Sequence, residues 1–405
     1  MMQADALSDL IARQRPNWSL EQAFYVSPEI YEIERRGWLA RQWYILGHVS
    51  EVAEPSSYMV RDLLGESLIV VRDASGTLRG FYNVCRHRGS RICDKDGRAS
   101  NLLCPYHAWS YRLDGSLRAA PAMPEGIDTR ALGLKSVPVR EVGGIILGSL
   151  TADPATADPI QRELEPGLRY CGFPQARIAA RRRYPTHGNW KLVIENFIEC
   201  YHCIPCHPEY ASVMRHIDVV ARDAPAAEAA WKEEVERWSR EDADTGSPLG
   251  VAPGVFSLPI CAATRAPIGG GRKTQSQDGQ PVAPLMGAQR RFDGGASGFR
   301  CEPFVFAVAL NDYGLMFQFL PTSPELTDVV ITWFVNASAG EAEVDVERMI
   351  WLWDVTTVQD KAIIERNAAG VRSRAYAPGP YSLLESWPSR LVARYLRELP
   401  AHVAP

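Results

Sequence analysis

No stretch of this 405-residue sequence is apolar over the roughly 18 residues that a membrane-spanning helix needs. The N-terminal residues also lack the apolar core of a signal peptide, because Asp5, Asp9, Arg13 and Pro16 interrupt them. Low-complexity tracts and internal repeats are absent as well. We therefore expect a soluble cytoplasmic protein that does not associate with a membrane.

An excess of positive charge is also missing. Lys and Arg number 44 against 48 Asp and Glu, which gives a formal net charge of −4. Nothing supplies a basic face for phosphates, so we expect no nucleic-acid partner, and the basic run at 181–183 is best explained as a solvated strand or loop. The nine cysteines are odd in number and scattered, unlike the disulfide framework of a small secreted protein. In a reducing compartment, cysteines more often bind metal or are simply buried.

The chain, with 46% apolar residues, is long enough for about two to three domains. Residues 1–44 have helical patterning, and we expect this segment to pack on the C-terminal domain. Residues 45–155 alternate short β-like runs with turns and end in a Pro- and Ala-rich linker at 151–160. Residues 156–405 mix strands and helices. The predicted fold class is therefore α+β, a small β domain followed by a larger domain of sheet and helices.

Several segments of the chain carry stronger signals. Residues 190–202 have a helical period that Pro205 and Pro208 end. The Gly- and Pro-rich stretch 247–298 predicts a long loop or lid. The other expected elements are strands at 67–72, 78–84, 142–150, 304–310, 315–320 and 329–335, and helices at 341–369 and 387–399.

Two mixed Cys–His pairs stand out. One residue separates Cys85 from His87 and two separate Cys104 from His107, and we expect each pair at the tip of a β-hairpin. Two thiolates and two imidazoles at such spacing bind zinc or a Rieske-type [2Fe–2S] cluster. The cluster is favoured, because zinc fingers usually pair Cys with Cys and His with His. Its neutral imidazoles raise the reduction potential, which suits the transfer of electrons to another centre.

A second set of metal ligands lies near the middle of the chain. His202 and His207 come just after Asn196 and Glu199, and the i, i+3 spacing predicts that Glu199 and His202 share one helix face. Two imidazoles and one carboxylate form the facial triad that holds Fe(II) with open positions for oxygen. Asp360 of the long C-terminal helix is our choice for the carboxylate. The alternatives from the same segment are Asp354 and Glu365.

Three cysteines surround this second set. Cys200, Cys203 and Cys206 offer a zinc site together with His207. We instead expect them to be buried thiols that pack beside the iron. An iron destination also explains why a cluster that delivers electrons is present at all.

With these residues in view, the sequence resembles the oxygenase α subunits of Rieske non-haem iron oxygenases over nearly its whole length. The resemblance rests on the segments 85–93 (CRHRGSRIC), 104–109 (CPYHAW), 188–191 (GNWK), 195–196 (EN), 199–202 (ECYH) and 207–208 (HP), and on Asp360. Most of the family has Asp where this chain has Glu199. With Glu at this position, the chain resembles the branch of the family that acts on quaternary ammonium compounds such as glycine betaine, carnitine and stachydrine.

The resemblance implies a Rieske β domain and a helix-grip-like catalytic domain with an antiparallel sheet. It also implies a homotrimer that takes electrons from NAD(P)H through a separate flavin/ferredoxin reductase. Electrons would pass from His107 of one subunit through Glu199 to His202 of the next, with Glu199 and Asn196 acting at the iron site. The expected reaction is O2-dependent oxidative N-demethylation of a small quaternary ammonium compound.

Two other functions remain open on the sequence. The same scaffold serves aromatic-ring hydroxylation and O-demethylation of aromatic acids. A Rieske electron carrier without catalysis would need only about 110 residues, and the second set of ligands argues against it. Aromatic residues that could face a cationic substrate, although core packing is favoured for each of them, are Phe197, Tyr201, Phe317, Phe319 and Trp333.

Overall fold

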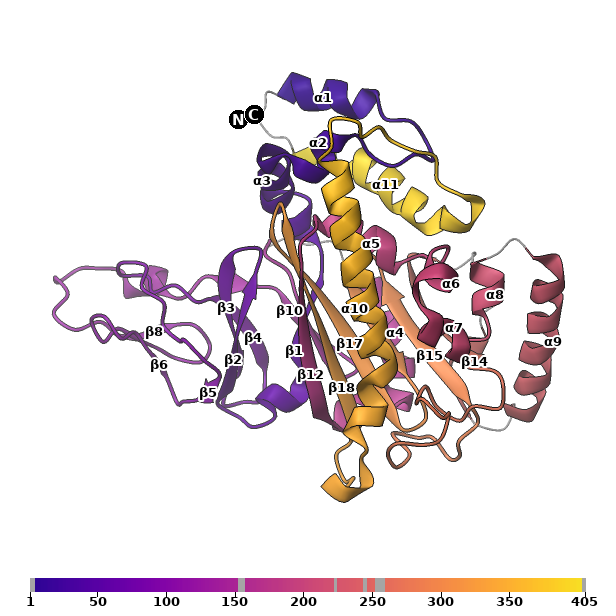
Figure 1. Cartoon of the computed structure of the whole chain (residues 1–405). Coiled ribbons are helices and arrows are strands. Elements are labelled where there is room, and N and C mark those ends of the chain that lie inside the picture. Colours follow the sequence, from indigo (N-terminus) through magenta and orange to yellow (C-terminus); the bar gives the residue numbers. More distant parts are fainter. Residues whose placement is uncertain (1–3, 152–156, 222–223, 243–245, 252–258, 403–405) are drawn as a thin grey trace.

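Two β-rich lobes and a layer of helices make up the protein, seen here in a computed structural model (Figure 1). The structure describes residues 4–151, 157–221, 224–242, 246–251 and 259–402. The predicted α+β architecture is confirmed, with the small β lobe first and the larger lobe of sheet and helices after it. Most of the predicted linker, 152–156, lies outside the described residues.

The first lobe is built from short antiparallel sheets. One has the strand order β5-β2-β3-β4-β9, a second has β6-β7-β8, and a third has β1-β11-β10. A hairpin loop joins β3 to β4, in which Asp73 accepts hydrogen bonds from the backbone of Ser75 and Thr77. The strands are β1 (Tyr44–His48), β2 (Ser57–Leu63), β3 (Glu66–Arg72), β4 (Leu78–Tyr82), β5 (Gly97–Arg98), β6 (Leu102–Leu103), β7 (Ser110–Tyr111), β8 (Leu117–Ala119), β9 (Ser136–Val137), β10 (Val139–Val142) and β11 (Ile145–Gly148).

The second lobe is organised by one seven-stranded sheet of order β12-β18-β17-β16-β15-β14-β13. Its central strands are buried on both faces, because α5 and α10 cover one side while α4 and the β1 sheet contact the sheet elsewhere. The strands are β12 (Ala176–Thr186), β13 (Gly250–Val251), β14 (Cys261–Pro267), β15 (Gly295–Cys301), β16 (Val305–Ala309), β17 (Tyr313–Ser323) and β18 (Leu326–Asn336).

Helices from both ends of the chain lie together on the second lobe (Figure 1). The Trp38 indole donates to Glu398 at 2.9 Å, and Ser19 donates its backbone N–H to Gly379. The helices are α1 (Ala4–Ala12), α2 (Gln22–Val26), α3 (Pro28–Arg36), α4 (Asp158–Tyr170), α5 (Trp190–Phe197), α6 (Cys203–Cys206), α7 (Pro208–Val213), α8 (Ile217–Val220), α9 (Pro225–Asp242), α10 (Val346–Val371) and α11 (Ser386–Glu398).

Some expected elements differ from the structure. The helix expected over 190–202 ends at Phe197, so Glu199 and His202 do not share a helix. The stretch 247–298 is not one long loop, because β13, β14 and the first residues of β15 lie in it. Small residues there, such as Ala262 and Ala263, still fit a strand once neighbouring strands supply the hydrogen bonds.

The cysteines also differ from expectation. Cys200 is joined to Cys203, and Cys261 to Cys301 across the β14–β15 pair. Cys206 is free and half-buried. The expectation of three free thiols beside the second metal site is therefore wrong for Cys200 and Cys203.

Candidate metal centres

The first ligand set lies at the tip of the first lobe. Cys104 and His107 occupy the turn between β6 and β7, as expected, whereas Cys85 and His87 lie in the longer loop after β4. Both thiols are buried, each with about 2% of its surface exposed, while His107 is exposed. The two imidazole rings lie 4.6 Å apart between centroids.

The backbone of both loops folds around the thiols. Gly89 donates its N–H to the carbonyl of Cys85 and has a φ of +79°, a conformation that glycine adopts without strain. The backbone N–H of Cys104 donates to the carbonyl of Trp109 at 2.8 Å. The indole ring of Trp109 stacks on the imidazole of His87. The Tyr111 hydroxyl accepts the backbone N–H of Arg86 at 2.9 Å and is hydrogen-bonded to the Cys85 sulfur at 3.2 Å.

The donor set of this tip fits an iron–sulfur cluster. Burial disfavours the Cys104 thiolate, but hydrogen bonds from the backbone of Tyr106, from Cys85 and from the backbone of His107 outweigh it and lower the pKa. Among the described residues, the buried Nδ1 of His87 has no hydrogen-bond partner. A buried ring nitrogen without a partner is costly unless it binds something. The two thiols and two imidazoles, one of them with this free nitrogen, could hold a [2Fe–2S] cluster.

The second ligand set converges on one point in the other lobe. The Nε2 atoms of His202 and His207 lie 3.1 Å apart, and the Oδ1 atom of Asp360 lies 3.3 Å from the first and 3.0 Å from the second. Ligands about 2.1 Å from a metal and at right angles to each other are about 3.0 Å apart. The three atoms could therefore occupy one face of an octahedral Fe(II) site and leave the other positions open.

Outer hydrogen bonds hold both imidazoles in the tautomer that a metal needs. His202 donates from Nδ1 to Glu199, and His207 donates from Nδ1 to Gln359 at 3.0 Å. The lone pairs of both Nε2 atoms are thereby directed at the shared point. Asn196 reaches the same place, with its amide 3.3 Å from Nε2 of His202.

The charge at this point also favours a cation. Burial disfavours protonated His202, but the carboxylates of Asp360 and Glu199 outweigh burial and raise its pKa to about 10. The same histidines hold the pKa of the buried Asp360 carboxyl below its usual range. A divalent ion would replace the extra proton on His202 and balance the negative charge of the two carboxylates.

An aromatic pocket of about 230 Å³ is lined by residues of α7 and α10, the helices that follow His207 and carry Asp360. Tyr210 follows His207 by three residues at the start of α7, and its ring lies 5.7 Å from that of Trp353. Trp353 precedes Asp360 by two helical turns on α10. Apolar residues and the neutral polar Thr264, Gln275 and Ser297 complete the wall, and the described residues that line the pocket include no Asp, Glu, Lys or Arg. The other aromatic members are His216, Trp231 and Trp387.

Comparisons with known proteins agree with this arrangement. Residues 173–399 match the model of the ring hydroxylating alpha subunit (catalytic domain), and residues 42–138 match the Rieske [2Fe-2S] domain. The glycine betaine monooxygenase oxygenase subunit of Chromohalobacter salexigens is 35% identical over 93% of this chain and 85% of that protein. The same subunit of Pseudomonas aeruginosa strain PAO1 is 32% identical over 98% and 94%. The chain belongs to the ring-hydroxylating α-subunit family of Rieske oxygenases.

A solved structure shows the same fold. The quaternary ammonium Rieske monooxygenase CntA in complex with L-carnitine covers 96% of this chain and 98% of its own, with a TM-score of 0.69 and 22% identity. As a Rieske oxygenase α subunit, the protein is an oxidoreductase that uses a [2Fe–2S] cluster and a mononuclear iron. It is the oxygenase part of a multicomponent system that includes a reductase and acts on a small molecule. Among the described residues, no helix is long and apolar enough to cross a bilayer.

The alternative ligands in this Rieske oxygenase are engaged elsewhere. Asp354 accepts a hydrogen bond from Tyr184, and Glu365 accepts from Lys361 at 2.7 Å. The sulfur of Cys203 does lie within 4.8 Å of the nearest ligand atoms of His202 and His207, but it is bonded to Cys200. The zinc site considered from the sequence therefore loses two of its thiolates.

The pocket aromatics were missed by the sequence analysis. Phe197, Phe317 and Phe319, named there by placement, instead pack against one another in the core, and Trp333 is fully buried. Tyr201 is exposed. Helical spacing from His207 and Asp360 would have pointed to Tyr210 and Trp353, whereas no local signal marks Trp231 or Trp387.

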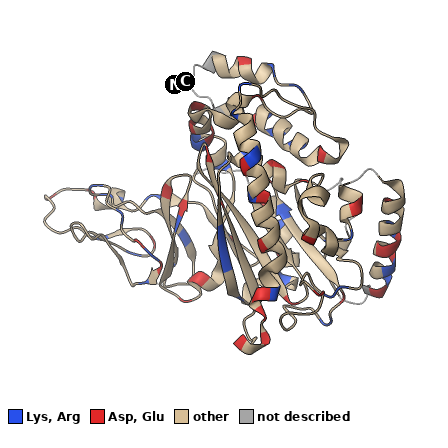
Figure 2. Cartoon of the chain, viewed as in Figure 1, with Lys and Arg blue, Asp and Glu red and all other residues tan. Residues whose placement is uncertain are grey.

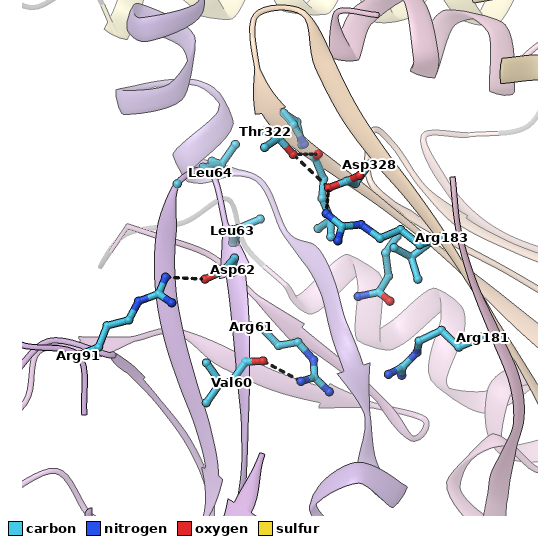
Figure 3. Close-up of a pocket in the computed structure, with 15 residues that line it drawn as sticks. Val60, Arg61, Asp62, Leu63, Leu64, Arg91, Arg181, Arg183, Thr322 and Asp328 are labelled. Atoms are coloured by element: carbon cyan, nitrogen blue, oxygen red, sulfur yellow. Dashed lines mark hydrogen bonds and ion pairs between the residues drawn. The ribbon is translucent and has the colours of Figure 1, made fainter. Parts of the chain in front are cut away.

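A larger cleft, of about 610 Å³, separates β2 from β12 and β18 (Figure 3). Positive and negative side chains are interspersed over both lobes, in keeping with the net charge (Figure 2). The basic run of β12 is a solvated strand face, as expected, and its Arg181 and Arg183 line this cleft. Each arginine of the cleft has a carboxylate partner, in the pairs Arg61–Glu51, Arg181–Glu51, Arg183–Asp328 and Arg91–Asp62.

Proposed function

We propose that this chain is the oxygenase component of a monooxygenase that removes an N-methyl group from a quaternary ammonium compound. The observation that carries the proposal is the aromatic pocket beside the converging ligands. Tyr210 lies on α7, which begins directly after His207, and Trp353 lies on α10 with Asp360, so a bound cation would lie close to the iron. Two relatives of nearly full length are glycine betaine monooxygenase subunits.

We assign the cofactor ligands as follows. Cys85, His87, Cys104 and His107 hold the [2Fe–2S] cluster. The mononuclear iron is held by His202, His207 and Asp360. The division of the chain is 1–44 as an N-terminal helical segment, 45–155 as the Rieske domain and 156–405 as the catalytic domain.

A quaternary ammonium ion cannot donate or accept a hydrogen bond. It is recognised by the negative faces of aromatic rings, each contact giving about 0.5–2 kcal/mol. Tyr210, Trp231 and Trp353 line a pocket of about 230 Å³, and we assign these contacts to their rings. The described lining residues include no Lys or Arg that would repel the cation.

The overall reaction consumes O2, two electrons and two protons. One oxygen atom enters a C–H bond of an N-methyl group, and the other leaves as water. The hydroxymethyl ammonium product then loses formaldehyde and one proton, and the C–N bond electrons stay on the amine. NAD(P)H supplies the electrons through the reductase, and the mononuclear iron supplies O2 activation when it is bound.

Three side chains around the iron hold its histidine ligands in place by hydrogen bonds. Glu199 holds the Nδ1 proton of His202 and Gln359 that of His207. Asn196 donates its amide toward the same ligand face. We propose that the protein is a homotrimer, in which Glu199 also accepts from the exposed His107 ring of a neighbouring subunit and so conducts electrons between subunits.

Formaldehyde release tests this function. The iron-loaded protein with a reductase and NADH should release formaldehyde from glycine betaine, carnitine or stachydrine, with about one NADH consumed per formaldehyde. Trp353→Leu should raise KM for that substrate about five- to thirtyfold, since the loss of one cation–π face costs about 1–2 kcal/mol. Trp333→Phe, in the core, is the matched control and should leave KM unchanged.

The opposite outcome is also informative. If no N-methyl ammonium compound yields formaldehyde while aromatic acids stimulate NADH oxidation with product formation, the proposal is wrong and the protein is an aromatic oxygenase. If fully loaded protein contains only the two cluster irons, it is an electron carrier.

A further inference from the structure

A second cavity, of about 310 Å³, reaches the outer side of His202. It is lined by carboxylates of three residues: Glu195 and Glu199, which are on or just after α5, and Glu385, which precedes α11. Asn196 lines it too, and is the residue whose amide lies 3.3 Å from Nε2 of His202. This cavity therefore joins the iron-ligand face to a polar space that the aromatic pocket does not include.

Glu195 is the carboxylate that the proposed function leaves without a role. Tyr25 donates its hydroxyl to Glu195 Oε1 at 3.2 Å, and Tyr381 donates to Oε2 at 3.0 Å. The ammonium of Lys191, one turn earlier on α5, is held by Glu34 at 2.6 Å. Glu195 is thus a carboxyl group held by neutral hydroxyl groups, half-buried against the cavity, one residue before Asn196.

The proposed reaction needs a proton supply at this place. Two protons enter for each O2 reduced, while His202, His207 and Asp360 are largely enclosed by protein. A buried site of this kind takes up protons through side chains and cavity water rather than directly from bulk solvent. The aromatic pocket offers no carboxyl group among its described lining residues, whereas the second cavity offers three.

We propose that Glu195 is the proton donor of this cavity, which passes protons toward the iron-ligand face beside Asn196 and is reloaded from solvent. The O–H bond of the Glu195 carboxyl breaks, a cavity water accepts the proton, and the carboxylate takes up a proton from solvent before the next transfer. No electrons move in this step. The inference rests on the proposed function, because that reaction is what consumes the protons.

The electrostatics of the cavity suit the role. Burial raises the pKa of Glu195 to about 7, although hydrogen bonds from Tyr381 and Tyr25 and the charge of Lys191 act in the other direction. Glu385, which faces the cavity from the C-terminal segment, raises it further. A donor whose pKa lies near the working pH exists in both forms, so it can release and regain a proton in each turnover.

Replacement of Glu195 by Gln tests the proposal. The amide keeps an acceptor for one tyrosine but has no transferable proton. We expect turnover to fall at least about tenfold while KM stays within about twofold. The wild type should lose rate as the pH rises through about 7, because the protonated donor disappears, and Glu195→Gln should lack that alkaline limb.

A second readout does not depend on turnover. In holoenzyme without substrate, infrared difference spectra should show a carboxyl band that titrates near pH 7 and is missing from Glu195→Gln. The cluster's visible spectrum and the iron content should be unchanged in the variant. If the band titrates in both proteins, or if Glu195→Gln keeps the wild-type rate and alkaline limb, the proposal is overturned.

Tyr381→Phe covers the case in which Glu195→Gln does not fold. Loss of this donor removes an interaction that lowers the pKa of Glu195, so the alkaline limb should move to higher pH. Tyr184→Phe is the matched control, since it removes a tyrosine–carboxylate bond, to Asp354, outside the cavity. If the alkaline limb of the pH–rate profile moves neither in Tyr381→Phe nor in Tyr184→Phe, or moves equally in both, the role of Glu195 is overturned. Absence of formaldehyde from every ammonium substrate would instead contradict the proposed function, and the infrared titration would still report on Glu195.

Discussion

Glu199 contacts His202, as their spacing suggests, but outside a helix. The helix α5 ends at Phe197, so Glu199 and His202 meet through an irregular turn rather than across a helix face. The second carboxylate oxygen of Glu199 accepts the backbone N–H of Tyr201, which folds the turn back on itself. Glu has one more methylene than the Asp found in most of the family. In this turn its carboxylate bonds the backbone N–H of Tyr201 and the ring of His202 at the same time.

Asp360 carries a prediction at the same scale. Asp360→Ala should lose the mononuclear iron and keep the cluster, so iron should fall from about three to about two per chain, measured by elemental analysis. The visible spectrum of the cluster should not change. The matched control is Asp354→Ala, whose carboxylate bonds Tyr184 and should not affect iron. Iron retained in Asp360→Ala but lost in Asp354→Ala would reassign the ligand.

At the scale of elements, a buried ion pair joins three helices. Glu34 of α3 accepts from Lys191 at 2.6 Å and from the Trp190 indole at 2.9 Å, both on α5, and from Tyr395 of α11. All four groups are fully enclosed. The pair fixes the helical segment at the N-terminus of the chain against the helix that leads to the iron ligands.

Breaking this pair should be costly. Lys191→Met leaves Glu34 charged and buried, and should lower the free energy of unfolding by about 3–5 kcal/mol. Thermal unfolding of the holo protein measures the effect. Lys361→Met removes a half-exposed pair with Glu365 and should cost less than about 1 kcal/mol. Equal losses in the two variants would mean that the buried pair contributes nothing particular to the helix contacts.

The helix α10 shows how one element serves two tasks. It places Asp360 at the metal ligands and Trp353, two turns earlier, at the aromatic pocket. The side chain of Gln359, also on α10, accepts the Nδ1 hydrogen of His207 and donates its amide N–H to Glu209 at 2.7 Å. A shift of this helix would therefore move the iron ligands and the substrate wall together.

At the scale of the whole molecule, the two ligand sets lie in different lobes. Figure 1 shows the loops around β6 and β8 at one end, while α6 and α7 lie on the opposite side of the large sheet. Cys104 and His107 lie in the β6–β7 turn, whereas His202 and His207 directly precede α6 and α7. In the proposed trimer, the cluster of one subunit would serve the mononuclear iron of its neighbour.

Mixed oligomers test that transfer. Cys104→Ser should lack a cluster and Asp360→Ala the mononuclear iron, so each should be inactive alone. Co-expressed at equal amounts, they should recover roughly a quarter of wild-type formaldehyde release, since that share of ordered neighbour pairs is complementary in a ring. The control pair, Glu199→Ala with Asp360→Ala, should stay inactive because no subunit has both an iron and its bridge. Recovery in the control, or none in the first mixture, contradicts transfer through Glu199.

The sequence by itself determined the features that depend on short spacing. Cys85 and His87 are near neighbours in the chain, as are Cys104 and His107. Each pair therefore lies in one short loop, whatever the rest of the fold is. The alternation of short strands followed by a sheet and helices was likewise enough for the α+β class. Local hydrogen bonding and periodicity carry this information.

Tertiary structure decided what depends on distant segments. Spacing could not choose among Asp354, Asp360 and Glu365, since the choice depends on which turn of α10 packs against the histidines. The pocket ring of Trp231 comes from α9 and that of Trp387 from α11, and Glu195 meets Tyr25 and Tyr381 from opposite ends of the chain. Such contacts are set by the packing of helices on the sheet, which no local pattern encodes.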